Sequence, residues 1–261
     1  MRFALRVEYN GTNYFGWQKQ KINKEKTIQY SVDKAISKVA NHKINSICGG
    51  RTDTGVHAFS QIIHFDTTSK RSDLNWIKGI NTFLPDDIII KDIFHVKEDF
   101  HARFSATDRT YRYIILNQHT PSSIFINNFL SYKDKIDILR IKASFKYIIG
   151  ENDFSCFRSS GCSSLSPIKN IKKLHIKKVR NFIIIDITAN SFLYHMVRNM
   201  VGCFIDIGIK KIEPKEMKKI LLSKDRRKIG VTVEPKGLYL LKISYPKKFN
   251  IKINDKFSLF N

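Results

Sequence analysis

Apolar and polar positions along the first hundred residues follow two different periods. Residues 3–9 alternate one by one, as in a strand, and end at Asn10-Gly11, a dipeptide typical of turns. Apolar residues then recur every three or four positions over 28–39, which predicts a helix with Thr27 as its N-cap. The rest of this half is expected to form a loop over 48–60, a strand over 61–66, a helix over 73–84 and a strand over 88–96.

The second half has the same mixed character. The elements expected there are a strand over 110–116, a helix over 136–149 closed by Gly150, two strands flanking the Arg180-Asn181 turn, helices over 191–209 and 214–222, and a strand over 238–245. This order predicts an α+β fold of two similar units that share a sheet, although no sequence repeat joins the halves. We expect subdomains over 1–105 and 106–245, followed by a basic, mobile tail over 246–261.

The charge of the chain suits a polyanionic partner. Lys and Arg number 46 against 23 Asp and Glu, giving a formal net charge of +23. Nucleic acid is the first candidate. A coding bias is the alternative, because Lys, Ile and Asn are all frequent and such a bias would raise the charge without selection for binding.

The cysteines indicate neither a metal site nor disulfides. The chain has four, without a CxxC pair or a histidine at metal-ligand spacing, at Cys48, Cys156, Cys162 and Cys203. No apolar run of about 18 residues occurs, and the N-terminus lacks the pattern of a signal peptide. We therefore expect a cytoplasmic protein with no metal and no contact with a membrane.

The loop over 48–58 carries the first candidate chemistry. Three glycines bracket Arg51, Asp53 and His57, and such glycines let a loop present side chains into a cleft. In an extended stretch Arg51 and Asp53 share a face, and an adjacent guanidinium favours an ionised carboxylate that can act as a nucleophile or base. A salt-bridged turn without chemistry fits the same spacing.

The helix expected over 191–209 has a polar stripe opposite a wide apolar face. The stripe holds Ser191, His195, Arg198, Asn199 and Gly202. Its glycine allows a backbone or a substrate to approach Arg198 closely, whereas a solvated arginine is the plainer alternative. For His195 we expect a hydrogen-bonding or phosphate-facing role rather than metal ligation.

Basic and aromatic residues alternate over 109–114. Tyr111 and Tyr113 fall on one face of the expected strand, an arrangement that lets rings stack on bases while guanidinium groups hold phosphates. An ordinary strand with an aromatic core face is the alternative. A second basic and aromatic cluster lies just upstream, over 100–104.

Taken together, these segments resemble the tRNA pseudouridine synthase A family over residues 3 to about 245. The motifs, in the family's order, are Tyr9-Asn10-Gly11 with Phe15-Gly16-Trp17-Gln18, the run from Gly50 to Ala58, Phe100 to Ala106, Tyr111-Arg112-Tyr113, Asp153 to Arg158 with Gly161-Cys162 and Ser166-Pro167, Phe192 to Asn199, and Gly237 to Leu240. Thr54 stands where the family usually has alanine. Val233-Glu234-Pro235 replaces the family's Ala-Pro-Ala, which displaces the proline and adds an acid.

The resemblance implies a role for four side chains. Asp53 would be the nucleophile that forms a covalent adduct with the target nucleotide, and Arg198 would pair with it. Arg51 would take the space that the flipped nucleotide vacates. Tyr111 would stack on the flipped uracil.

The resemblance also implies a fold, a substrate and an assembly. The fold is the pseudouridine synthase fold, with two similar ferredoxin-like subdomains sharing a central mixed sheet and a basic cleft. The reaction is isomerisation of uridine to pseudouridine at positions 38, 39 and 40 of the tRNA anticodon stem-loop, by a homodimer that needs no cofactor. The alternative is a non-catalytic RNA-binding protein or tRNA chaperone with the same fold. A DNA-binding regulator fits less well, because no helix-turn-helix or zinc pattern is present.

Overall fold

The structure is a computed structural model that describes residues 1–253. The chain divides into two units: Met1–Arg109 with the chain from Tyr239 onward, and Thr110–Leu238. Each unit combines strands and helices, which confirms the α+β class. The boundary lies close to the expected one, but the last strand, expected in the second subdomain, joins the first unit.

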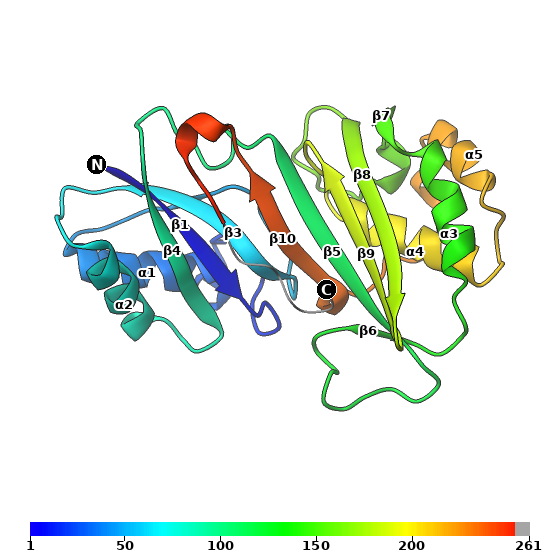
Figure 1. Cartoon of the computed structure of the whole chain (residues 1–261), viewed down its shortest axis with the longest axis horizontal. Helices are drawn as coiled ribbons and strands as arrows, with labels where there is room; N and C mark the ends of the chain where they lie inside the picture. The colour runs from blue at the N-terminus through cyan, green and yellow to red at the C-terminus, as the bar shows by residue number, and fades with distance from the viewer. Residues whose placement is uncertain (254–261) are drawn as a thin grey trace. The chain divides into compact units, whose positions relative to one another are not determined.

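The strands of the first unit are arranged around β1 (Figure 1). Antiparallel pairing joins β1 (Arg2–Tyr9) to β4 (Ile88–Val96) on one side and to β3 (His57–Asp66) on the other. β3 also pairs with the short β2 (Ile47–Cys48) and, in parallel, with β10 (Leu238–Ser244), where Tyr239 lies opposite His57. This parallel pairing explains why the end of the chain belongs to the first unit.

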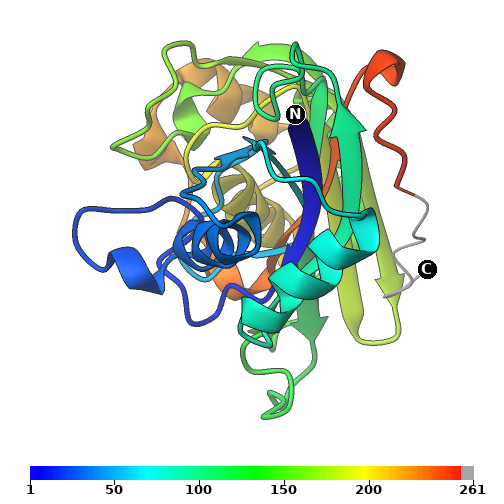
Figure 2. The ribbon, with the colours of Figure 1, turned by 90° about the vertical axis from the view of Figure 1, so that its left-hand side faces the viewer.

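Helices α1 (Ile28–Ala40) and α2 (Asp73–Phe83) cover one face of these strands (Figures 1 and 2). The apolar residues whose spacing predicted α1 are all buried, namely Ile28, Val32, Ile36 and Val39. The indole of Trp76 packs 5.8 Å from the ring of Phe3 and 5.7 Å from that of Phe65, so α2 is fixed to β1 and β3 by aromatic contacts. Thr27 occupies the N-cap position of α1, but its hydroxyl donates to a preceding carbonyl instead of capping the helix.

The second unit is also built on antiparallel strands. Its strands are β5 (Asp108–Asn117), β9 (Phe182–Ala189), β8 (Ile168–Val179) and β7 (Gly150–Asp153), in that order, with β6 (Leu130–Tyr132) parallel to β5. β8 and β9 form the predicted hairpin, whose turn places Arg180 at a φ of +53°.

The helices of the second unit are α3 (Ile138–Ser144), α4 (Met196–Gly208) and α5 (Glu216–Ser223). The first two are shorter than their apolar patterns predicted. After α3 the chain tightens into a 3₁₀ turn, so the expected helix over 136–149 is wrong at both ends. α4 begins five residues late, because His195 has a φ of +59° and cannot continue a right-handed helix.

The first part of the C-terminal tail is docked on the first unit. Phe249 is buried and packs 5.1 Å from the ring of Phe100, and the Lys248 ammonium lies 2.8 Å from the Asp99 carboxylate. The expectation of a mobile tail is therefore wrong for Pro246 to Asn250. Residues 254–261 lie outside the described part of the chain.

Candidate active site

Asp53 lies in a tight loop between β2 and β3, which we call the Asp53 loop (residues 49–56). β3 starts at His57, four residues earlier than expected, so the loop is shorter than the sequence suggested. The N–H of Val56 donates to the carbonyl of Asp53 (3.1 Å) and closes a turn in which Gly55 has a φ of +75°. The Asp53 side chain is half-buried and that of Arg51 is exposed.

The segment before α1, which we call the opening loop (residues 10–27), holds the Asp53 loop in place. The N–H of Trp17 donates to the carbonyl of Thr52 (3.0 Å), and the N–H of Gly55 donates to that of Tyr14 (3.2 Å). The hydroxyls of Tyr9 and Thr52 lie 2.7 Å apart in the buried interior. Two motifs separated by about forty residues in the sequence thus form one structure.

One close contact between the two loops is at Gly16. This residue has a φ of +80°, and a Cβ added to it would lie 2.5 Å from the Thr52 carbonyl oxygen and 3.0 Å from the carbonyl carbon of Asp53. Only glycine fits this approach. The backbone on either side of the Asp53 side chain is therefore set by the opening loop.

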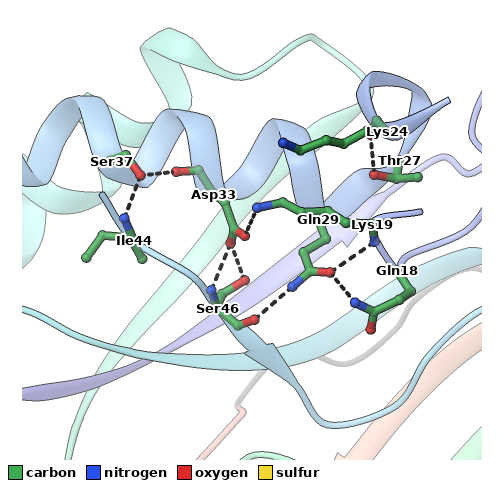
Figure 3. A network of polar contacts seen from close by, with 9 residues as sticks. All are labelled: Gln18, Lys19, Lys24, Thr27, Gln29, Asp33, Ser37, Ile44 and Ser46. Atoms are coloured by element: carbon green, nitrogen blue, oxygen red, sulfur yellow. Dashed lines mark hydrogen bonds and ion pairs between the residues drawn. The ribbon is translucent and has the colours of Figure 1, made fainter. Parts of the chain in front are cut away.

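A buried polar network ties the opening loop to α1 (Figure 3). The carboxylate of Asp33 pairs with the Lys19 ammonium and accepts from the N–H (3.0 Å) and hydroxyl (2.5 Å) of Ser46. The Gln29 carbonyl accepts from the Gln18 side chain (2.8 Å) and from the N–H of Lys19 (3.1 Å), while its amide donates to the carbonyl of Ser46 (2.9 Å). Burial raises the pKa of Asp33, and the contacts with Lys19 and Ser46 offset part of that shift.

Replacement of Asp33 by alanine is expected to lower the free energy of unfolding by about 2–3 kcal/mol, because the Ser46 donors and the Lys19 ammonium lose a buried acceptor. Chemical denaturation of the two proteins measures the difference.

Asp33→Asn separates hydrogen bonding from charge. Since burial raises the pKa of Asp33, the charge itself contributes little, and the asparagine carbonyl should restore most of the lost stability. Asp99→Ala, which removes an exposed ion pair with Lys248, is the matched control and should leave the unfolding midpoint unchanged. An Asp33→Ala protein as stable as the original would show that the network does not hold the loop.

In the second unit, the two strand tyrosines differ in their surroundings. Tyr113 is fully buried and its hydroxyl donates to the carbonyl of Glu234 (2.7 Å), so this side chain belongs to the core. Burial raises the pKa of Tyr113 far above its usual value. Tyr111 is 8% exposed, and its ring meets that of Phe192 edge-on at 5.1 Å. Of the two, Tyr111 is the one that retains some access to solvent.

The polar side of α4 packs against an extended segment over 229–234. The Nε of Arg198 donates to the carbonyl of Val233 (2.8 Å), and the hydroxyl of Thr232 donates to the Asn199 side chain (2.5 Å). A Cβ on Gly202 would lie 2.2 Å from the carbonyl oxygen of Val231. The expectation that this glycine admits a close backbone is confirmed.

His195 precedes α4 and has a hydrogen-bonding role. Its Nδ1 lies 3.2 Å from the hydroxyl of Ser159. Burial, with smaller contributions from Arg198 and Arg226, lowers the pKa of His195 to about 4, so the ring is neutral at pH 7. Among residues 1–253, no group of three or more His, Cys, Asp or Glu side chains is placed to hold a metal ion. Nor does that part of the chain contain a helix with the length and apolarity that crossing a bilayer requires.

Comparison with known proteins agrees with these observations. A family model described as tRNA pseudouridine synthase matches residues 5–105 and 144–246, and so covers both units. The chain belongs to this family. The tRNA pseudouridine synthase A of Buchnera aphidicola subsp. Schizaphis graminum is 49% identical over 252 residues, covering 97% of this chain and 95% of the relative. That of Vibrio campbellii is 44% identical over 251 residues, covering 96% and 94%.

The four residues that resemblance to the tRNA pseudouridine synthases singled out are divided between the units. Asp53 and Arg51 lie in the Asp53 loop of the first unit. Tyr111 lies on β5 and Arg198 on α4, both in the second. The ion pair between Asp53 and Arg198 stays a prediction.

Two arginines support the family motifs in ways that the sequence did not indicate: Arg109 was expected to hold phosphates, and Arg226 was not singled out. Arg109 donates to the carbonyl of Gly49 through Nε (3.2 Å) and Nη2 (2.8 Å), at the start of the Asp53 loop. Arg226 donates to the side chains of Asn199 (3.2 Å) and Thr232 (2.8 Å) and so holds the segment that Arg198 contacts. Arg226 belongs to a run of three basic residues, and such a run normally indicates a solvated surface, so no sequence signal marked it.

Proposed function

We propose that this protein isomerises uridine to pseudouridine at positions 38, 39 and 40 in the anticodon stem-loop of tRNA. Membership in the tRNA pseudouridine synthase family carries the reaction class. The observation that carries the site is the Asp53 loop, in which a half-buried carboxylate sits on a backbone fixed by the opening loop. A rigid support of this kind is what a nucleophile requires, because its approach to the substrate must be reproducible.

In the proposed reaction Asp53 attacks the target nucleotide and forms a covalent adduct while the bond between N1 of uracil and C1′ of the ribose breaks. The freed uracil rotates, its C5 forms the new bond to C1′, and the covalent bond between Asp53 and the nucleotide breaks, which frees the carboxylate. The proton on C5 leaves to solvent and N1 gains one, so the product is an isomer of the substrate. No oxidant, reductant or group donor takes part.

The other three residues bring the target nucleotide within reach of Asp53 and keep the Asp53 carboxylate charged. Arg51 is exposed beside Asp53, in a place suited to fill the stem when the target nucleotide flips out. Tyr111 stacks on the flipped uracil. Arg198, whose Nε already donates to Val233, pairs with the Asp53 carboxylate through its other N–H groups and keeps it ionised.

The partner is tRNA, and the enzyme acts as a homodimer in the cytoplasm. The net charge of +23 supports a polyanionic substrate, since each phosphate contact releases counterions and strengthens binding.

Tritium release from a tRNA transcript labelled at C5 of uridine tests the reaction. The protein should release label to water with multiple turnovers, and a transcript without uridine at positions 38, 39 and 40 should release none. Equal release from both transcripts would place the modified site elsewhere. Tight binding to tRNA without any release would leave a non-catalytic RNA-binding protein or tRNA chaperone as the better description.

A further inference from the structure

Phe104 is an apolar ring on the surface for which the proposed reaction has no use. It lies between β4 and β5, in a segment that we call the platform loop (residues 100–105), and its side chain is 76% exposed. A single exposed apolar side chain is common on protein surfaces, so the observation that sets Phe104 apart is how firmly its ring is held.

Phe104 is the outer end of a column of rings in contact, and its own contact with His101 is the stacked one. Its ring lies 4.4 Å from that of His101 at an interplanar angle of 28°. The His101 ring lies 4.9 Å from His64, which is buried and meets Phe100 edge-on at 5.9 Å. The column runs from the core of the first unit to its surface and holds the exposed ring in a defined plane.

Hydrogen bonds fix the backbone that carries this ring. The Nδ1 of His101 accepts from the N–H groups of Arg103 (3.2 Å) and Phe104 (3.1 Å), and the Nδ1 of His64 accepts from that of Ala102 (3.1 Å). Burial lowers the pKa of both imidazoles, to about 4 for His64, so the nitrogens are unprotonated acceptors at neutral pH. The loop is therefore preorganised, and a ligand would not have to order it.

The platform loop is joined to the Asp53 loop. The Nη2 of Arg109 donates both to the carbonyl of Arg103 (2.6 Å) and to that of Gly49 (2.8 Å). A Cβ on Gly49 would lie 3.0 Å from the carbonyl oxygen of Ala102, so the two backbones are in close contact. Phe104 thus keeps a fixed position relative to the loop that carries Asp53.

The charge next to Phe104 indicates the chemical class of its partner. The guanidinium of Arg103 lies 5.5 Å from the centre of the Phe104 ring, and Arg51 is exposed on the adjoining loop. Aromatic rings and guanidinium planes are the surfaces on which unpaired bases stack, and the same cations attract phosphates. A purely apolar protein partner would not need them.

We propose that Phe104 and Arg103 form a stacking platform for an unpaired base of the substrate RNA, beside the Asp53 loop. The identity of that RNA as tRNA rests on the proposed function. The platform adds affinity and helps to place the RNA, and it takes no part in bond making.

Binding of an unmodified tRNA transcript to Phe104→Ala, measured by fluorescence anisotropy, tests the platform. We expect a Kd roughly 5- to 100-fold higher than that of the original protein, the range found for loss of one stacked base. The slope of log Kd against log salt should stay unchanged, because no charge is lost. Arg103→Ala should lower that slope by about one.

Phe104→Trp adds a direct signal. A tryptophan at this position should retain binding, and its fluorescence should change on addition of RNA. The two native tryptophans, Trp17 and Trp76, are fully buried and give a constant background.

Phe83→Ala is the matched control. Phe83 is also an exposed phenylalanine of the first unit with a cation over its ring, the Lys38 ammonium at 4.7 Å, but it lies at the end of α2. This variant should bind tRNA as the original does, and both alanine variants should keep the original unfolding midpoint.

An unchanged Kd for Phe104→Ala would overturn the proposed platform. If the original protein releases tritium, the proposed reaction would still stand. An unchanged Kd together with a change in oligomeric state would assign Phe104 to a contact between protein copies. If Phe104→Ala weakens binding but no protein releases tritium, the platform stands and the proposed reaction fails.

Discussion

Asp53→Ala is expected to lower tritium release from labelled tRNA by roughly 10⁴-fold or more, because no other group can replace a lost nucleophile. Binding should change by less than about threefold. The structure supports this separation, since backbone groups, the Thr52 hydroxyl and the Arg109 guanidinium all make hydrogen bonds that hold the Asp53 loop. Single-turnover assays and anisotropy on the same preparations measure the two effects.

Two further variants show whether the carboxylate itself is required. Asp53→Asn keeps the size and polarity of the side chain and should be as inactive as the alanine variant. Asp134→Ala removes an exposed aspartate of the other unit and should be fully active. Loss of tRNA binding together with activity in Asp53→Ala would instead support the salt-bridged turn, the structural interpretation that the spacing of Arg51 and Asp53 also allowed.

Local patterns in the sequence predicted the elements whose stability is local. The strand expected over 88–96 is β4, with the same ends, and the apolar spacing of α1 matches its buried face. The start of α4 could not be found in this way. Leu193 continues the apolar pattern and is buried, yet the chain there is not helical, because the pattern reports which side chains are buried and not the backbone conformation.

Long-range pairing set the limits of the fold prediction. The parallel pairing of β10 with β3 joins Tyr239 to His57, which are far apart in the sequence. The local sequence of either strand does not predict this pairing. The domain boundaries and the docking of Phe249 on Phe100 depend on the same kind of distant contact.

In the candidate site, too, the local features could be predicted from the sequence and the distant contacts could not. The glycines around Asp53 were visible in the sequence, and the resemblance to a family gave that residue a role. The support of the loop was not visible, because the hydroxyl of Tyr9 and the N–H of Trp17 reach Thr52 across gaps of 43 and 35 residues. Motif recognition therefore gave the candidate reacting groups, and the structure was needed to show how the loop that carries Asp53 is held.

Gly16→Ala is expected to lower kcat/KM by roughly 100-fold although Gly16 takes no part in the chemistry. The new Cβ would lie 2.5 Å from the Thr52 carbonyl oxygen, 3.0 Å from the carbonyl carbon of Asp53 and 3.1 Å from the nitrogen of Thr54. All three are backbone atoms, which cannot rotate away as a side chain does, so the peptide that carries Asp53 must shift. A displacement of about 1 Å at a reacting group can reduce the rate by this factor.

Gly161→Ala separates this displacement from the cost of the backbone conformation. Gly161 has a φ of +78°, close to the +80° of Gly16, but nothing lies within 4 Å of the position its Cβ would take. Alanine at either site should cost about 1 kcal/mol of stability for the left-handed conformation. Only Gly16→Ala adds a clash, so it should be the less stable of the two and should alone lose activity, as thermal unfolding and tritium release would show. Equal activity in both variants would mean that the opening loop gives way at no cost, and that the position of Asp53 is set by some other contact.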